Sequence, residues 1–103
     1  MTKFKKQLQA IESLDWQIDQ NDNEIEISNY SPAGEQLVEY LNADNIVESC
    51  KSIYENYDAD EHAEMWIAHR GKDGVPNSIT ELVNDANKIE QMYYDLYQKV
   101  LCA

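Results

Sequence analysis

The stretch DWQIDQNDNEIEISNY, residues 15–30, decides the fold class, because apolar and polar residues alternate in it twice. Trp16 and Ile18 supply the apolar phase of the first run, and Ile25 and Ile27 supply that of the second. A period of two is typical of half-buried strands. The residues between the runs, 20–23, tolerate turn conformations. The stretch therefore predicts a β-hairpin.

A second turn and a third strand are expected directly after this hairpin. The motif SPAG, residues 31–34, predicts a turn, because proline presets φ and glycine can adopt a positive φ. The third strand is expected roughly over residues 35–41. Leu37 and Leu41 share one face with Glu39, whereas Val38 and Tyr40 share the other, so the pattern leaves the inward face open.

The rest of the chain follows a helical period. Residues 3–14 carry apolar side chains at i, i+4 and i+7, which predicts a short amphipathic helix. Three later helices are each expected to begin at an N-cap residue followed three residues later by glutamate. These pairs are Asn45 with Glu48, Asp58 with Glu61, and Ser78 with Glu81. The predicted fold is α+β: an N-terminal helix, a three-stranded antiparallel β-meander and three C-terminal helices packed on one sheet face, in a single domain of residues 1–103.

The last of these helices has the most regular apolar stripe. Its stripe steps by three and four residues through Ile79, Leu82, Ala86, Ile89, Tyr93, Leu96 and Val100. Two interpretations are open: the helix packs along its own domain, which is favoured, or it also forms the seam of a coiled-coil dimer. Tyr93, Tyr94 and Tyr97 cluster near its end. They are a candidate contact patch, or they border the core with their hydroxyls in water.

The charge of the chain narrows the class of partner. Twenty acidic residues against eight basic ones give a formal net charge of −12. Such a charge repels nucleic acid and anionic membranes and favours a basic protein surface, although it can also serve solubility alone. Asp15, Asp19, Glu24 and Glu26 fall in the polar phase of the hairpin. They are predicted to form an exposed acidic face that meets a basic partner.

The stretch DADEHAEMWIAHRG, residues 58–71, contains the strongest candidates for a metal or catalytic site. His62 and Glu64 match the HxE of zinc-dependent nucleobase deaminases, but the required PCxxC is missing from the sequence. His62 and His69 would lie about 10 Å apart along a helix, which is too far for one zinc ion. The stretch is therefore interpreted as an amphipathic helix anchored by Trp66. We expect no catalytic residue, no metal site and no cofactor, and hence no enzyme.

The location of the protein is expected to be cytoplasmic. The N-terminal sequence MTKFKKQLQ lacks the apolar region of a signal peptide, and no apolar run approaches the length of a membrane span. Cys50 and Cys102 form no CxxC motif and are expected to be free thiols.

The sequence also resembles a family of small acidic proteins that occur in bacterial genomes, phages and mobile elements. The similar elements are Asp60-Glu61-His62, Glu64-Met65-Trp66, Gly74-Val75-Pro76, Leu82-Val83, Asp85-Ala86, Ile89 and Met92, together with the upstream SNYSPAGE. The resemblance implies a counter-defence role, such as anti-restriction or anti-CRISPR activity.

Charge and resemblance lead to one functional expectation and one alternative. The expected function is that of a non-enzymatic acidic binding protein, an inhibitor that occupies a host nuclease or other nucleic-acid-binding defence protein by mimicking nucleic acid. The alternative is a structural or assembly protein that forms a homodimer through the long C-terminal helix.

Overall fold

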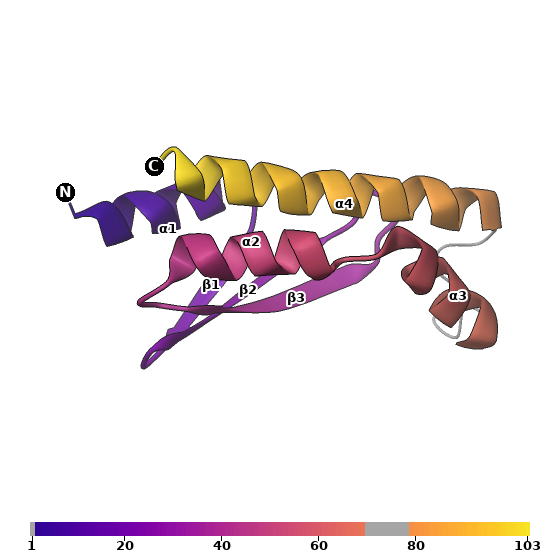
Figure 1. The fold of residues 1–103 in the computed structure, drawn as a ribbon, viewed down its shortest axis with the longest axis horizontal. Helices are drawn as coiled ribbons and strands as arrows, with labels where there is room; N and C mark the ends of the chain where they lie inside the picture. Colours follow the sequence, from indigo (N-terminus) through magenta and orange to yellow (C-terminus); the bar gives the residue numbers. More distant parts are fainter. Residues whose placement is uncertain (1, 70–78) are drawn as a thin grey trace.

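The computed structural model describes residues 2–69 and 79–103, and the side chains of all of these except 66–69 and 79. The elements are α1 (Lys3–Ser13), β1 (Gln17–Asn21), β2 (Glu24–Tyr30), β3 (Gln36–Asn42), α2 (Ile46–Asn56), α3 (Ala59–His69) and α4 (Ile79–Leu101). The three strands form one antiparallel sheet in the order β1-β2-β3. This arrangement, shown in Figure 1, confirms the predicted α+β fold with its β-meander.

The two predicted turns join the strands. In the hairpin of β1 and β2, Ile18 pairs with Ile27, and Asp22 in the loop has a φ of 54°, in the left-handed region that aspartate tolerates. In the SPAG turn, Gly34 has a φ of 97° and donates its N–H to the carbonyl of Ser31 at 2.8 Å. Glycine is suited to that position because it has no Cβ to clash.

The inward face of β3, which the sequence pattern leaves open, is the one with the leucines. Leu37 and Leu41 are buried, and the Glu39 side chain lies between them, partly buried. Val38 and Tyr40 point to the other face and are exposed. A carboxylate therefore occupies an inward position on an otherwise apolar stripe.

The core lies between the sheet and helices α1, α2 and α4. Ile11 of α1, Cys50 of α2 and Leu96 of α4 are fully buried with the inward isoleucines of β2. Trp16 stacks on Tyr93 with ring centroids 6.1 Å apart. Six members of the apolar stripe of α4 are buried in the protomer itself: Leu82, Ala86, Ile89, Tyr93, Leu96 and Val100. The favoured interpretation, that the long helix packs along its own domain, is confirmed.

Helix α3 differs from the predicted arrangement in its position. Figure 1 places it at one end of the molecule, beyond the sheet and under the N-terminal part of α4, against which it packs. Helix α1 instead lies with α4 over the sheet and contacts β1. The side chain of Trp66, the predicted anchor of α3, lies outside the described residues, as do the side chain of His69 and the whole of Ser78 and Gly74-Val75-Pro76.

Of the predicted N-cap residues of α2 and α3, only that of α3 makes capping hydrogen bonds with its side chain. The Asp58 carboxylate accepts N–H groups of Asp60 at 2.9 Å and Glu61 at 3.2 Å, so the predicted cap of α3 is confirmed. Asn45 precedes α2, but its side chain makes no capping hydrogen bond. Its carbonyl accepts the Ser49 hydroxyl at 2.7 Å instead. In the described part of the chain, no helix is both long and apolar enough to cross a membrane.

Candidate functional site

The face of the sheet turned away from the helices is not covered by any of the described elements (Figure 1). We call it the outer sheet face. The register assigns to it the residues Gln17, Asp19, Asn21, Glu24, Glu26, Ser28, Tyr30, Gln36, Val38, Tyr40 and Asn42. Three of the four predicted acidic residues thus lie on one face, and Asp19 stands directly opposite Glu26 on the neighbouring strand.

No basic residue offsets this charge within the sheet. None of the three strands contains lysine or arginine, and the sequence has no basic residue between Lys6 and Lys51. Directly opposed like charges destabilise a sheet, so the Asp19–Glu26 pair has an energetic cost. The Tyr40 hydroxyl, 3.2 Å from the Glu26 carboxylate, donates to it, and this hydrogen bond raises the pKa of Tyr40. Tyr30 and Tyr40 are 62% and 58% exposed, so aromatic rings accompany the carboxylates.

Asp15, the fourth predicted acidic residue, does not lie on this face. It precedes β1, and its φ of 68° is in the left-handed region. A left-handed residue interrupts the two-residue alternation of a strand. The alternation that assigns Asp19 to the outer sheet face therefore does not extend to Asp15. Asp15 is exposed in the turn between α1 and β1.

The three tyrosines of α4 do not form one exposed patch. Tyr93 is 4% exposed and lies in the core, where burial raises the pKa of its hydroxyl. Tyr94 and Tyr97 turn toward α2 and contact the ring of Tyr54, at centroid distances of 5.3 and 6.5 Å. Tyr94 is the most accessible of the three, at 40%. The rings mainly join α2 to α4.

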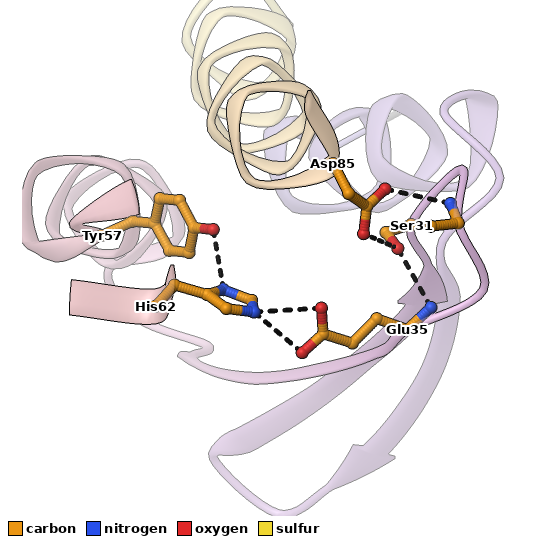
Figure 2. Close-up of polar contacts among 6 residues, drawn as sticks. Ser31, Glu35, Tyr57, His62 and Asp85 are labelled. Atoms are coloured by element: carbon orange, nitrogen blue, oxygen red, sulfur yellow. Dashed lines mark hydrogen bonds and ion pairs between the residues drawn. The ribbon is translucent and has the colours of Figure 1, made fainter. Parts of the chain in front are cut away.

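A polar network connects α2, α3 and the segment before β3, as Figure 2 shows. His62 Nε2 lies 2.9 Å from one Glu35 carboxylate oxygen and 3.0 Å from the other. The Tyr57 hydroxyl lies 2.8 Å from His62 Nδ1. Burial, and then the nearby charge of Glu35, raises the pKa of Tyr57, so its hydroxyl remains a donor. With Tyr57 donating to Nδ1, His62 donates its Nε2–H to Glu35.

A second set of hydrogen bonds ties α4 to the SPAG turn (Figure 2). The Asp85 carboxylate is 2% exposed, and it accepts the Ser31 hydroxyl at 2.6 Å and the Ala33 N–H at 2.9 Å. The Ser31 oxygen in turn accepts the Glu35 N–H at 3.0 Å. The network holds α4, the turn and α3 in one arrangement.

We call these two sets of hydrogen bonds the clamp; its side chains are those of Ser31, Glu35, Tyr57, His62 and Asp85. The Ser31 hydroxyl donates to the buried Asp85 carboxylate, which also accepts the Ala33 N–H, and the Ser31 oxygen accepts the Glu35 N–H. His62 is bonded to Tyr57 and Glu35, and Figure 2 shows no bond between His62 and Ser31. The network thus joins the SPAG turn and the start of β3 to α3 and α4.

The described residues bring together no metal-binding group of three or more His, Cys, Asp or Glu side chains. Cys50 is buried, and burial raises the pKa of its thiol to about 12, which disfavours the thiolate. Cys102 is exposed and directly follows Leu101, the last residue of α4.

The sequence-based predictions give Ser31, Glu35 and Asp85 no site role, although motifs that contain them belong to the family resemblance. One signal for Asp85 is present in the sequence: it lies three residues after Leu82 and four before Ile89, on the apolar stripe of α4. A charged residue in such a position must find buried partners. Its partners 52 and 54 residues earlier could not be identified by spacing.

The comparisons with known proteins find no matching family model, no matching curated protein and no matching solved structure. The function must therefore be inferred from the residues of the chain itself.

Proposed function

We propose that the protein is a non-enzymatic acidic binder of a basic, nucleic-acid-binding protein surface, and that the outer sheet face makes the contact. The observation that carries this proposal is an uncovered sheet face with Asp19, Glu24 and Glu26 and without any basic residue. Retaining an opposed carboxylate pair at a cost in stability is understandable if a basic partner neutralises it.

The spacing of the sheet supports mimicry of nucleic acid. Neighbouring strands lie about 4.8 Å apart, and alternate residues along a strand lie about 6.8 Å apart. Carboxylates on such a lattice are comparable in spacing with the phosphates along a nucleic-acid strand. A partner that holds phosphates with lysine and arginine can hold these carboxylates in the same way.

The counter-defence role implied by the sequence resemblance extends this proposal. The partner would then be a host restriction or CRISPR-type nuclease, and the protein would inhibit it by occupying its nucleic-acid channel. The alternative, assembly through α4, has less support, because six residues of the stripe it would use are buried in the protomer's own core.

The test compares two variants of equal charge. The first, the outer-face variant, carries Asp19→Asn, Glu24→Gln and Glu26→Gln. The second, the control variant, removes three exposed acidic side chains away from the outer sheet face, by Glu12→Gln, Glu55→Gln and Glu64→Gln. Both have a net charge three units less negative than the natural chain.

Each variant is used to capture proteins from host lysate at about 50 and about 500 mM NaCl, where screening differs strongly. A captured nucleic-acid-binding protein is then tested for displacement of its oligonucleotide. We expect the natural chain and the control variant to capture and displace at low salt, and the outer-face variant to fail. Equal capture by the two variants would contradict the proposal, since net charge alone would then explain the binding.

A further inference from the structure

A cleft of about 600 Å³ opens between α2 and β3. Glu39 and Tyr40 line it from the strand, and Glu48, Ser49, Ser52 and Asn56 line it from the helix. Its volume falls within the range of ordinary ligand pockets. It is too large for a single ion and suits a short segment of chain.

Glu39 is the unusual group in this cleft. It occupies an inward position between Leu37 and Leu41, and burial raises the pKa of its carboxyl despite the hydrogen bond from Tyr93. That hydrogen bond, from the Tyr93 hydroxyl to Oε1 at 3.2 Å, is the one that the described residues provide. An ionised carboxylate accepts up to about four hydrogen bonds, so Glu39 retains acceptor capacity toward the cleft.

The lining of the cleft is complementary to a cation. Glu48 adds a second carboxylate, and no lysine or arginine is among the lining residues. The planar guanidinium of arginine matches a carboxylate better than an ammonium does, and it also stacks on aromatic rings. The rings of Tyr40 and Tyr57 border the cleft and offer such surfaces.

The edge of β3 provides groups that recognise a peptide backbone. The Asn42 N–H points away from β2 and donates to the Ser49 hydroxyl at 3.0 Å. In an antiparallel strand, every second residue directs its N–H and C=O to the same side. Tyr40 therefore directs its backbone groups to this edge, and it lines the same cleft as Ser52 and Asn56.

We propose that the cleft between α2 and β3 receives a basic peptide segment of the partner, with one arginine side chain bound to Glu39. This inference rests on the proposed function and deepens it, because it names the group that anchors the partner. The cleft is continuous with the outer sheet face through Tyr40, which lines the cleft and also bonds to Glu26. A basic segment that crosses the outer sheet face reaches Glu39 over the edge of β3.

The inward position of Glu39 on an edge strand also has a second explanation, which is protection of the sheet edge. An inward-pointing charge on an edge strand prevents edge-to-edge pairing with another chain. That role requires a charge at this position and no ligand. The two explanations differ in what the cleft binds.

The experiment is an NMR titration of the isotope-labelled protein with a short blocked peptide of alternating arginine and glycine. The matched peptide contains citrulline, which is neutral and of the same shape. We expect the arginine peptide to shift the amide signals of Ser49, Ser52 and Asn56, which line the cleft from α2, and the citrulline peptide to leave them unchanged. Glu39→Gln should lower the affinity for the arginine peptide by about tenfold or more, as for loss of a charge-assisted hydrogen bond.

The control for this variant is Glu55→Gln, which removes one exposed charge from α2 outside the cleft. It should change the affinity by less than about twofold, as for a screened surface charge. Equal effects of Glu39→Gln and Glu55→Gln, or shifts confined to the outer sheet face, would overturn the inference and leave the edge-protection role.

The same titration with the outer-face variant separates this inference from the proposed function. If the outer-face variant weakens binding and Glu39→Gln does not, the proposed function stands and the cleft inference falls. If Glu39→Gln alone weakens binding, the cleft inference stands and the outer sheet face loses its role. If neither variant weakens binding, both are wrong.

Discussion

Two acidic residues occupy inward positions of this fold, and their surroundings differ. Asp85 is 2% exposed, and both of its oxygens accept hydrogen bonds. Glu39 is only partly buried, and Tyr93 is the one described residue that bonds to it. Buried polar groups are normally satisfied, so Asp85 has the character of a structural residue and Glu39 that of a group that a ligand completes.

Replacement of Asp85 tests the structural role of the clamp. Asp85→Ala leaves the Ser31 hydroxyl and the Ala33 N–H without their acceptor. Each unsatisfied buried group costs about 1–3 kcal/mol, so the loss of the acceptor for two groups should lower the free energy of unfolding by about 2–6 kcal/mol. Urea unfolding measures this loss. Glu90→Ala, at an exposed position of the same helix, should change stability by less than about 0.5 kcal/mol, and a similar loss from both variants would show that the clamp is unimportant.

The raised pKa of Glu39 predicts how stability depends on pH. Because burial raises this pKa in the folded state, the folded chain binds more protons than the unfolded chain between the two pKa values. The stability contributed by this group is fully present below the unfolded pKa and is lost as pH rises through the folded pKa. Glu39→Gln keeps an acceptor for Tyr93 and removes that loss. Thermal unfolding should show a stabilised variant near pH 7 and little difference near pH 3; destabilisation near pH 7 would contradict this.

The sequence shows both of these residues as polar interruptions of apolar stripes, but it does not show their partners. Asp19, Glu24 and Glu26 could be assigned to one face, because a period of two holds throughout each strand. Asp15 could not, since its left-handed backbone conformation is invisible in the pattern. The clamp escaped prediction because hydrogen bonds between residues distant in sequence leave no periodic signal.

At the scale of the elements, α4 organises the molecule. It packs against α1, α2 and α3, and its buried stripe contributes Ile89, Tyr93, Leu96 and Val100 to the same core as the sheet. The period of that stripe predicts the helix and its buried face, and alternation predicts the hairpin. An apolar stripe does not identify the element that packs against it. The position of α3 beyond the sheet could therefore not be derived from the sequence.

Truncation of the α4 stripe should therefore be costly. Leu96 is fully buried, whereas Leu101, at the end of the same helix, is 48% exposed. Leu96→Ala should lower the free energy of unfolding by about 2–5 kcal/mol, because it removes buried surface and leaves a cavity. Leu101→Ala should lower it by much less. Chemical denaturation of the two variants measures the difference. Equal losses of stability would contradict the assignment of Leu96 to the core.

At the scale of the whole molecule, the net charge of −12 acts against the compact state. Self-repulsion of like charges destabilises a folded chain. Salt weakens this repulsion by shortening the Debye length from about 30 Å at 0.01 M to about 8 Å at 0.15 M. The melting temperature should therefore rise over this range of NaCl. The outer-face variant, with three fewer negative charges, should show a smaller rise. A melting temperature independent of salt in both proteins would contradict this account.

If the protein mimics nucleic acid as proposed, the elongation of the molecule bears on the kind of nucleic acid that it replaces. The chain extends over 45 × 23 × 20 Å. Twelve net charges along 45 Å correspond to one charge per about 3.8 Å. Duplex DNA carries one charge per about 1.7 Å of axis, and each of its strands one per about 3.4 Å. The net charge per length is thus close to that of one strand, so the proposed mimicry predicts a partner groove that accommodates a single-stranded polyanion rather than one that grips a double helix.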